Sequence, residues 1–350
     1  MEYRKLPKGT EEISVIGLGC GYIHEASEKE ITETIQTAYE NGINCLDCAA
    51  SSSKPFAAYG NALQGIRKEM YLQIHFGASY ETGEYGWTTS LSKIQRSIDW
   101  QLKCLKTDYI DFGFIHCMDQ KADLDHYIRN GVLDMIQSLK SQGVIHHIAL
   151  STHTPKVASL VLDMGLADLI MFSINPAYDY DHGEYAIGST DERAALYRRC
   201  AAEGVGISVM KPFDGGILLD ASRSPFGMAL TQYQCIQYAL DKPGVLTVLP
   251  GVRGRQDLAK LLGFFDASPQ ERDYSILGTC TPETATPHCV YCSHCAPCPQ
   301  GLDVALINKY YDLSLAGDSM AKDHYMKLET KASACTQCGH CNMRCPFSVN

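Results

Sequence analysis

This sequence contains no long apolar run and no block of basic residues, and both absences limit the classes of partner that we expect for the protein. A helix that crosses a membrane needs about 18 or more consecutive apolar residues, so we expect no transmembrane segment and no membrane partner. The amino-terminal stretch MEYRKLPKGTEE is polar where a signal peptide would be apolar, which predicts a cytoplasmic location. The formal net charge of −10 argues against nucleic acid as a partner.

Cysteine, by contrast, is abundant and concentrated at one end of the chain. Eight of the sixteen cysteines lie in the last 62 residues, in two evenly spaced runs. The second run has the spacing of bacterial ferredoxins, in which three close thiolates hold one 4Fe-4S cluster and a fourth, before a proline, ligates the other cluster. We therefore predict two 4Fe-4S clusters, one held by Cys289, Cys292, Cys295 and Cys345, and the other held by Cys335, Cys338, Cys341 and Cys298.

Two other uses of these cysteines are weaker hypotheses. Disulfide bonds need an oxidising compartment, and structural zinc rarely uses three consecutive two-residue gaps followed by Cys-Pro. The third gap of the first run has two residues where the usual ferredoxin has three, so Cys298 is assigned from topology. Paired clusters imply one-electron transfer, which predicts a redox enzyme with a ferredoxin or a flavoprotein as its partner.

The remainder of the chain predicts an α/β barrel. The sequence has 350 residues, of which 45% are hydrophobic and 20% charged, enough for two domains. Within the first 265 residues, β-rich apolar runs alternate eight times with amphipathic helical stretches, the pattern of a TIM (β/α)8 barrel. We expect the barrel over residues 1–265, a linker over 266–288 rich in Pro, Thr and Ser, and a ferredoxin-like 4Fe-4S domain over 289–350. The expected strands are Ser14–Leu18, Ile43–Asp47, Tyr71–Phe76, Tyr109–His116, Val144–Ser151, Leu169–Ile174, Val205–Lys211 and Val245–Pro250.

A doubly wound sheet is the alternative fold. The segment from Gly17 to Gly21 follows an expected strand, but it does not have the G-x-G-x-x-G pattern. No acidic residue follows about twenty positions later at a strand end. The dinucleotide-binding sheet is therefore excluded.

Polar residues at the strand ends are the candidate site, because the chemistry of a TIM barrel lies where its strands end. Asp47, His75, His116 and Lys211 end the second, third, fourth and seventh strands. Candidate cofactor-binding residues are Ser151 and Asn175 after the fifth and sixth strands, and Gly251, Arg253 and Arg255 after the eighth. This last loop precedes a helix, where backbone N–H groups and arginines favour a phosphate group.

Together these residues resemble the aldo/keto reductase family, and specifically its branch with a C-terminal ferredoxin-like domain. The resemblance rests on Gly42–Asp47, Asp111–His116, Ser151–Thr154, Val209–Gly216 and Leu249–Arg253, and it extends over essentially the whole chain with the cysteine runs. It implies carbonyl reduction by hydride transfer from NADPH, with an Asp, Tyr, Lys and His tetrad at the strand ends. Asp47 matches the aspartate and His116 the histidine.

The other two members of the tetrad are replaced in this sequence. Ser52 stands where the resemblance implies the tyrosine, and His75 stands where it implies the lysine. A serine hydroxyl is far too weak an acid to protonate an alkoxide, whereas an imidazole that titrates near pH 6.5 is a competent donor at neutral pH. Asp47 could orient such an imidazole, and Lys211 lies nearby.

Several functions follow from these residues. Our main hypothesis is an iron-sulfur oxidoreductase that acts on a small molecule at the barrel mouth, with electrons passing through two 4Fe-4S clusters. The first alternative is an NADPH-dependent carbonyl reductase that uses His75 as the acid, with NADP(H) as a further cofactor. The remaining alternatives are a non-catalytic electron-transfer protein, and a non-redox lyase or metal site built on Asp47, His75 and His116, the ligand types of a two-His-one-carboxylate triad.

Overall fold

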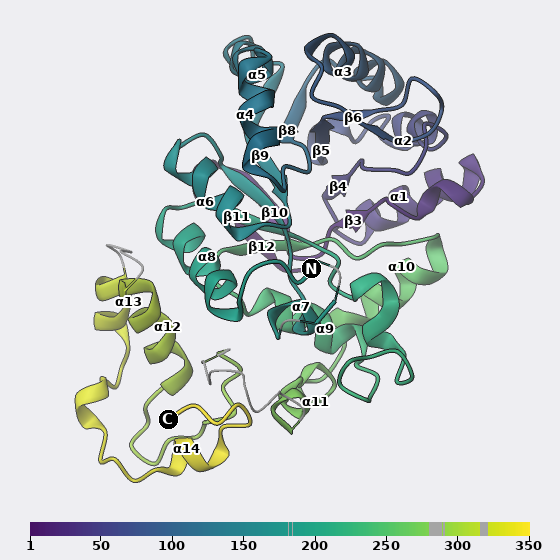
Figure 1. The fold of residues 1–350 in the computed structure, drawn as a ribbon. Coiled ribbons are helices and arrows are strands. Elements are labelled where there is room, and N and C mark those ends of the chain that lie inside the picture. Colours follow the sequence, from purple (N-terminus) through teal and green to yellow (C-terminus); the bar gives the residue numbers. More distant parts are fainter. Residues whose placement is uncertain (181, 184, 280–288, 290, 316–320) are drawn as a thin grey trace. The chain divides into compact units, whose positions relative to one another are not determined.

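Eight parallel strands form the central sheet of the structure, a computed structural model that describes residues 1–180, 182–183, 185–279, 289, 291–315 and 321–350. Their residues are almost all buried, as expected for strands covered by helices on the outer face. The sheet order is β12-β11-β10-β9-β8-β5-β4-β3 (Figure 1). Its strands are β3 (Leu18–Gly19), β4 (Cys45–Asp47), β5 (Tyr71–Phe76), β8 (Ile110–Ile115), β9 (Ile145–Thr152), β10 (Leu169–Ser173), β11 (Gly206–Met210) and β12 (Val245–Val248).

The first and last strands of this order meet and close the sheet into a barrel. Parallel bridges join Ile16 to Val248 and Gly19 to Gly251. The N–H of Gly19 donates to the carbonyl of Pro250 at 3.0 Å, and this close approach leaves no room for a Cβ atom at Gly19. The prediction of eight βα units in a barrel is therefore confirmed, although the first strand begins four residues later than expected, at Leu18, and β3 and β9 each end one residue later than expected.

Two antiparallel hairpins, which the sequence did not predict, complete the barrel. In the first, β1 (Tyr3–Lys5) pairs with β2 (Glu12–Ser14). Leu6 and Ile13 of this hairpin belong to the same buried cluster as Phe112, Leu169 and Leu246. Leu169 begins β10 and Leu246 is the second residue of β12, so the hairpin covers the amino-terminal end of the barrel and leaves the carboxyl ends of the strands for chemistry.

The second hairpin lies after β5. Here β6 (Ala78–Ser79) pairs with β7 (Gly86–Trp87), and Gly83 takes the left-handed conformation that the turn between them requires. An isolated antiparallel bridge also joins Ser52 to Glu84. The loop after β4 is therefore tied to the hairpin that follows the next strand.

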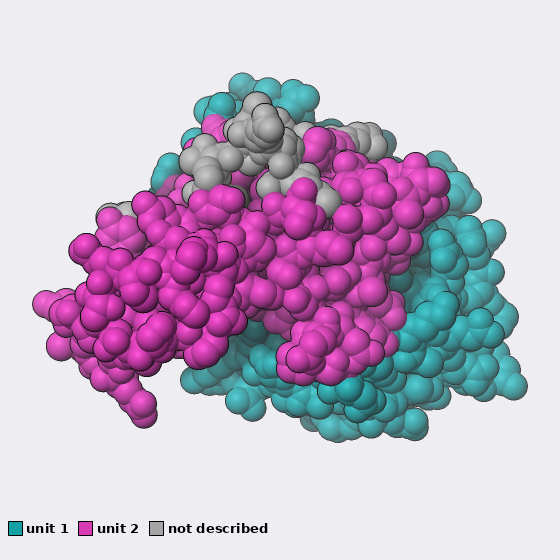
Figure 2. All heavy atoms as spheres, turned by 90° about the horizontal axis from the view of Figure 1, so that it is seen from below, with its two compact units in different colours: residues 1–173, 206–212, 246–266 teal, residues 174–205, 213–245, 267–350 magenta. Residues whose placement is uncertain are grey.

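The chain folds as two compact units (Figure 2). The first comprises residues 1–173, 206–212 and 246–266 and contains the sheet. Its helices are α1 (Glu28–Glu40), α2 (Phe56–Ala62), α3 (Leu91–Leu105), α4 (Lys121–Arg129), α5 (Val132–Ser141), α6 (Pro155–Asp163) and α10 (Arg255–Leu262). These are amphipathic segments whose apolar side is buried, as in α3, where Ile94, Ile98 and Leu105 recur at helical spacing.

The second unit comprises residues 174–205, 213–245 and 267–350. Its helices are α7 (Pro176–Asp179), α8 (Thr190–Ala202), α9 (Gln232–Leu240), α11 (Pro269–Arg272), α12 (Val304–Leu315), α13 (Ala321–Lys327) and α14 (His340–Arg344). Helix α8 packs against α12, and α9 packs against α11. This division differs from the expected boundary at residue 265, because α8 and α9, which the sequence assigned to the barrel, share a unit with the cysteine-rich segment.

The cysteine-rich segment is helical and irregular in its described part. Within 289, 291–315 and 321–350 there are α12, α13, α14 and a 3-10 turn at Ala332–Ala334, and no strand. The expected linker contains α11 and a 3-10 helix at Ser275–Thr279, while its residues 280–288 lie outside the described part of the chain. Among the described helices none combines the length and the apolar character needed to span a membrane.

Candidate active site at the barrel mouth

Asp47, His75 and His116 are brought together by three adjacent strands. Asp47 ends β4, His75 lies near the end of β5, and His116 directly follows β8. His75 Nε2 is 2.7 Å from Asp47 Oδ1, and His75 Nδ1 is 2.8 Å from His116 Nδ1. All three residues are at least nine-tenths buried. They form a continuous hydrogen-bonded row across the carboxyl ends of the strands.

Tyr85 extends this row, and the sequence analysis did not identify it. Its hydroxyl is 2.9 Å from His116 Nε2. The β6–β7 hairpin holds it there, since the N–H of Tyr85 donates to the carbonyl of Ser51 at 3.0 Å and Trp87 Nε1 donates to the carbonyl of His116 at 3.2 Å. Tyr85 is 42% exposed, unlike the other members of the row. The one signal in the sequence was the turn at Thr82-Gly83-Glu84 just before it.

The surroundings of this row favour neutral imidazole and phenol. Burial, and then the neighbouring His75 and His153, hold the pKa of His116 well below its usual range. Burial, followed by the nearby Cys117, raises the pKa of Tyr85 to about 12. His116 is therefore a neutral imidazole and Tyr85 a neutral phenol at neutral pH. Hydrogen bonds occupy all four imidazole nitrogens of His75 and His116, so these rings face each other, Asp47 and Tyr85.

Ser52 lies beside this row without joining it. The residue is 3% exposed, and its Oγ makes no hydrogen bond within the described part of the chain. Its position is set by the bridge to Glu84, next to Tyr85 on the hairpin. The hairpin thus carries a phenol into the neighbourhood where the resemblance implies a tyrosine at Ser52.

A second polar group adjoins His116. The ligand atoms of Cys117, Asp119 and His153 lie within 4.8 Å of one another, the one such group among the described residues. These three side chains could hold a metal ion. The Asp119 carboxylate also anchors the end of β9, because it accepts hydrogen bonds from His153 N at 2.6 Å, His153 Nδ1 at 2.9 Å and Thr152 Oγ1 at 3.1 Å.

Lys211 lies close enough to this group to act on it electrostatically. Burial and then Asp119 raise the pKa of the Cys117 thiol to about 11, and Lys211 opposes that rise. The backbone of Lys211 adopts a positive φ of 55°, uncommon for a residue with a side chain. Ser151 contributes its carbonyl to the same loop, accepting from the N–H of Met118 at 3.0 Å.

The remaining expected cofactor-binding residues have separate local roles. Asn175 caps α7, where its side chain accepts from the N–H of Tyr178 at 3.0 Å. Arg255 forms ion pairs with Glu30 at 2.8 Å and Glu33 at 2.9 Å, so its guanidinium is already neutralised. The Arg253 side chain is 70% exposed. It lies 5.6 Å from the ring of Tyr22, a side chain that also packs on Gly251.

Candidate cysteine site in the C-terminal segment

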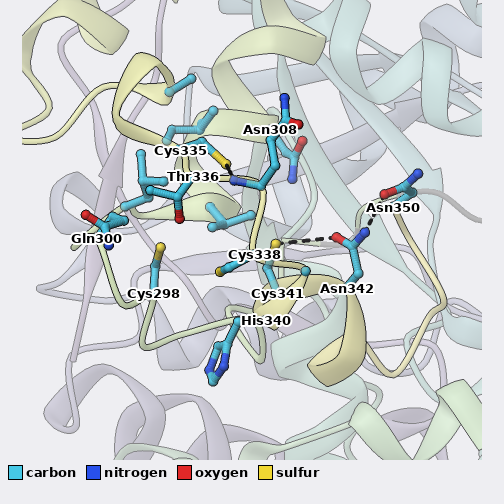
Figure 3. Close-up of a pocket in the computed structure, with 16 residues that line it drawn as sticks. Cys298, Gln300, Asn308, Cys335, Thr336, Cys338, His340, Cys341, Asn342 and Asn350 are labelled. Carbon is cyan, nitrogen blue, oxygen red and sulfur yellow. Dashed lines mark hydrogen bonds between the residues drawn. The ribbon is translucent and has the colours of Figure 1, made fainter.

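Cysteines from both runs surround one hollow in the second unit. Cys298 of the first run lines it together with Cys335, Cys338 and Cys341 of the second run, and its volume is about 400 Å³ (Figure 3). The thiols of Cys335 and Cys338 belong to exposed residues, and those of Cys298 and Cys341 to half-buried ones. The N–H of Gln337 donates to the sulfur of Cys335 at 3.3 Å.

The other four cysteines of the two runs also approach one another. Burial raises the pKa of Cys292 to about 11, and the nearby Cys345 and Cys295 add to this rise. A backbone hydrogen bond to the Cys292 sulfur partly opposes it. Burial also raises the pKa of Cys295, and among its ionisable neighbours Cys345 has the largest effect on that pKa. Cys298 thus lies with the first three cysteines of the second run, and Cys345 lies near Cys292 and Cys295 of the first run.

Comparison with known proteins agrees with the barrel. The model of the Aldo/keto reductase family matches residues 15–233, a range that ends before the cysteine runs. The curated relative "Uncharacterized oxidoreductase YqkF" of Bacillus subtilis is 31% identical over 161 residues, 45% of this chain and about half (51%) of the relative. "L-galactose dehydrogenase" of Arabidopsis thaliana is 23% identical over 63% of this chain and 68% of its own length.

Solved structures of similar fold support the same architecture. The holo form of "aldo-keto reductase AKR11C1 from Bacillus halodurans" matches with a TM-score of 0.61 and 23% identity. The match covers 78% of this chain and 94% of that chain. At this identity the likeness concerns the fold.

Proposed function

The chain belongs to the aldo/keto reductase family, and on that premise we propose that it is an oxidoreductase that interconverts a carbonyl group and an alcohol on a small molecule at the barrel mouth. NADPH would supply the hydride that reaches the carbonyl carbon. The observation that carries this proposal is the buried row of Asp47, His75 and His116, linked at 2.7 Å and 2.8 Å at the carboxyl ends of adjacent strands. Such a row can deliver the proton that the carbonyl oxygen needs.

In this proposal His75 does not donate its proton directly to the substrate, in contrast to the hypothesis that His75 is the acid. Both nitrogens of His75 face partners inside the protein, Asp47 and His116. His75 therefore acts by orienting His116 and exchanging a proton with it, and His116 lies one step nearer the substrate. Asp47 fixes the orientation of His75, because its carboxylate lies at hydrogen-bond distance from His75 Nε2.

The donors around β12 suit a phosphate-bearing nucleotide. Arg253 offers an exposed guanidinium beside the Tyr22 ring, and the loop leads into the N-terminus of α10. Arg255 fits less well, since Glu30 and Glu33 hold it. Arg253 is thus our candidate for the phosphate contact.

The test is NADPH consumption by the purified protein with a panel of small aldehydes and ketones. The wild type should oxidise NADPH only when a carbonyl compound is present. His75→Phe should lower kcat by roughly 10^2- to 10^4-fold, the usual contribution of a positioned acid or base. The matched control is His146→Gln, which changes a half-exposed histidine at the start of β9, at the end of the barrel away from the mouth. Absence of NADPH binding in the wild type, or unchanged kcat in His75→Phe, would contradict the proposal.

A second component of the proposal is a pair of 4Fe-4S clusters in the second unit, through which electrons from a ferredoxin or a flavoprotein would enter or leave. Its support is the hollow of about 400 Å³ around Cys298, Cys335, Cys338 and Cys341. Sulfurs around a tetrahedral zinc ion lie about 3.8 Å apart, but no three of these cysteines belong to a group within 4.8 Å among the described residues. A cluster suits this wider spacing better than a single ion.

Iron and sulfide analysis of anaerobically purified protein tests the clusters. About eight irons and eight acid-labile sulfides per chain are expected for two cubanes. Cys298→Ala should damage the cluster of the second run, and Cys345→Ala that of the first. Cys104→Ala, which changes a half-buried cysteine of the barrel, should keep both. Two zinc ions per chain with negligible iron would overturn this component and leave the carbonyl reductase proposal intact.

A further inference from the structure

We propose that Tyr85 is the catalytic residue that hands the proton to the substrate oxygen, and that Asp47, His75 and His116 form a proton wire that reloads it. This inference rests on the carbonyl reductase function proposed above and names the residue at its reacting end. It follows from a tertiary contact, because Tyr85 lies on the β6–β7 hairpin and not at a strand end.

The wire is continuous and has one exposed end. Its links are 2.7 Å from Asp47 to His75, 2.8 Å from His75 to His116, and 2.9 Å from His116 to the Tyr85 hydroxyl. Asp47 and the two histidines are at least nine-tenths buried, whereas Tyr85 is 42% exposed. The phenol is therefore the most exposed point of the row at which a proton can leave or enter. His116 cannot meet a substrate directly, because both of its nitrogens are already engaged.

The hydrogen bonds of the row can point in either of two directions, depending on which nitrogens carry hydrogen. A carboxylate only accepts, and a neutral imidazole has one donor and one acceptor. With Asp47 ionised and both histidines neutral, His75 Nε2–H donates to Asp47, and His116 Nδ1–H donates to His75. Tyr85 O–H then donates to His116 Nε2, so the phenolic hydrogen points inward. In this state, which we call the unloaded state, the row cannot deliver a proton to a substrate.

One additional proton on His75 reverses the row. His75 then donates through both nitrogens, His116 accepts at Nδ1 and donates from Nε2, and the Tyr85 oxygen accepts. The phenolic O–H is left to point toward a substrate. The charge is balanced, because the imidazolium of His75 faces the Asp47 carboxylate at 2.7 Å. This is the loaded state of the wire.

The chemical step balances in atoms and electrons. The carbonyl oxygen gains the Tyr85 proton, and with the hydride that bound NADPH would supply to the carbonyl carbon the products would be an alcohol and NADP+. The phenolate takes the proton from His116 Nε2, and His116 takes one from His75. A solvent proton entering through the exposed phenol then restores the loaded state. Alcohol oxidation runs the same transfers in reverse.

Neighbouring groups are poorer proton donors to a substrate. Tyr80, whose ring centre lies 6.3 Å from that of Tyr85, is buried and hydrogen-bonded to both the N–H and the carbonyl of Ala50. Cys117 holds its proton with a pKa of about 11 because of burial and then Asp119. Neither of them belongs to a chain that reaches a buried carboxylate.

The first experiment compares Tyr85→Phe with Tyr80→Phe, which removes a hydroxyl from the same hairpin without touching the wire. Tyr85→Phe should lower kcat for carbonyl reduction by roughly 10^2- to 10^4-fold, with little change in KM or in NADPH binding. Tyr80→Phe should leave kcat within about threefold. If the wild type reduces carbonyls with NADPH and Tyr85→Phe does so equally well, the role of Tyr85 is refuted while the proposed function stands.

The second experiment does not depend on turnover. Nitrogen NMR of protein with labelled histidines reports which ring nitrogen carries hydrogen. In the unloaded state His116 should carry its hydrogen on Nδ1, and Tyr85→Phe should shift the resonance of Nε2, whereas Tyr80→Phe should not. A His116 signal that carries hydrogen on Nε2 throughout the pH range, or one unaffected by Tyr85→Phe, would overturn the wire even in a protein for which no carbonyl substrate has been found.

Discussion

The barrel mouth and the cysteine hollow are two polar sites that differ in how completely the polypeptide organises them. At the barrel mouth, Asp47, His75 and His116 are buried and hydrogen-bonded to one another at 2.7–2.8 Å. In the hollow, Cys335 and Cys338 are exposed and the segment around them has short helices and no described strand. A site built from strand ends is thus organised by the fold itself, whereas the cysteine segment, on the proposal of two clusters, would gain its rigidity from what its thiols bind.

Removing one thiol from the hollow should have a larger effect than any change at the barrel mouth. In Cys338→Ala we expect one cluster to be lost, about four of about eight irons. Residues 289–350 should then become susceptible to proteases, because ligand binding and folding are coupled in small metal-held segments. Limited proteolysis with mass spectrometry is the measurement, with Cys104→Ala as the control. Unchanged protection of this segment in the metal-free protein would mean that the polypeptide alone holds it.

A substitution at Ser52 tests how rigidly the barrel mouth is organised. Ser52→Tyr restores the residue type that the resemblance implies, but Ser52 is 3% exposed and bridges to Glu84 beside Tyr85. We expect the added ring to displace the hairpin and to lower kcat by about 10^2-fold, the cost of a misplacement of about 1 Å. Ser51→Tyr places the same ring at an exposed neighbour and should cost little. A gain of activity in Ser52→Tyr would show that the mouth adapts.

The opposite end of the barrel provides a pH test of purely structural polar contacts. His147 contacts Asp168 at 3.0 Å and Glu11 at 3.1 Å. Burial alone would lower the pKa of His147, but these two partners outweigh it and raise that pKa. The resulting stability is therefore present at low pH and is lost as pH rises through the raised pKa.

His147→Gln should accordingly lower the free energy of unfolding by about 2 kcal/mol near pH 6, the usual contribution of hydrogen bonds to charged groups. The difference from wild type should shrink by about pH 9. Urea unfolding at both values is the measurement, and kcat should not change. An equal decrease in the free energy of unfolding at both pH values would mean that the protonated form of His147 is no more stabilising than the neutral form.

The smallest expected effect concerns the two arginines after β12. Arg253→Ala should weaken NADPH binding by about tenfold, or about 1.4 kcal/mol, because its guanidinium is 70% exposed and its ion pair with Asp257 is long, at 4.0 Å. Arg255→Ala should weaken it less, because Glu30 and Glu33 already hold that side chain. Fluorescence titration with NADPH measures both. A larger effect for Arg255 would mean that the nucleotide displaces the two glutamates.

Most of the barrel was predictable because its elements are encoded by local patterns. The run Tyr71–Phe76 was expected as a strand, and β5 has these bounds. His75 and His116 were expected to converge because parallel neighbouring strands end at the same face. The cysteine spacing likewise predicted that Cys298 would lie with the second run, and it lines the same hollow as Cys335, Cys338 and Cys341.

Contacts between loops were not predictable in this way. Tyr85 and His116 are 31 positions apart, and they meet only because the hairpin folds back along Ser51 and Ser52. Arg255 meets Glu30 across 225 positions, which removes it from the set of available phosphate ligands. The assignment of α8 and α9 to the second unit depends on their packing against α12 and α11.

Periodicity and spacing were enough to predict the eight strands, the polar residues at their ends and the two cysteine runs, because these patterns act over a few neighbouring residues. That a phenol from a hairpin completes the row at Asp47, His75 and His116, and that Arg255 is neutralised, became visible in the folded protein. Such contacts depend on how distant segments pack, and the side chains that make them carry no local pattern.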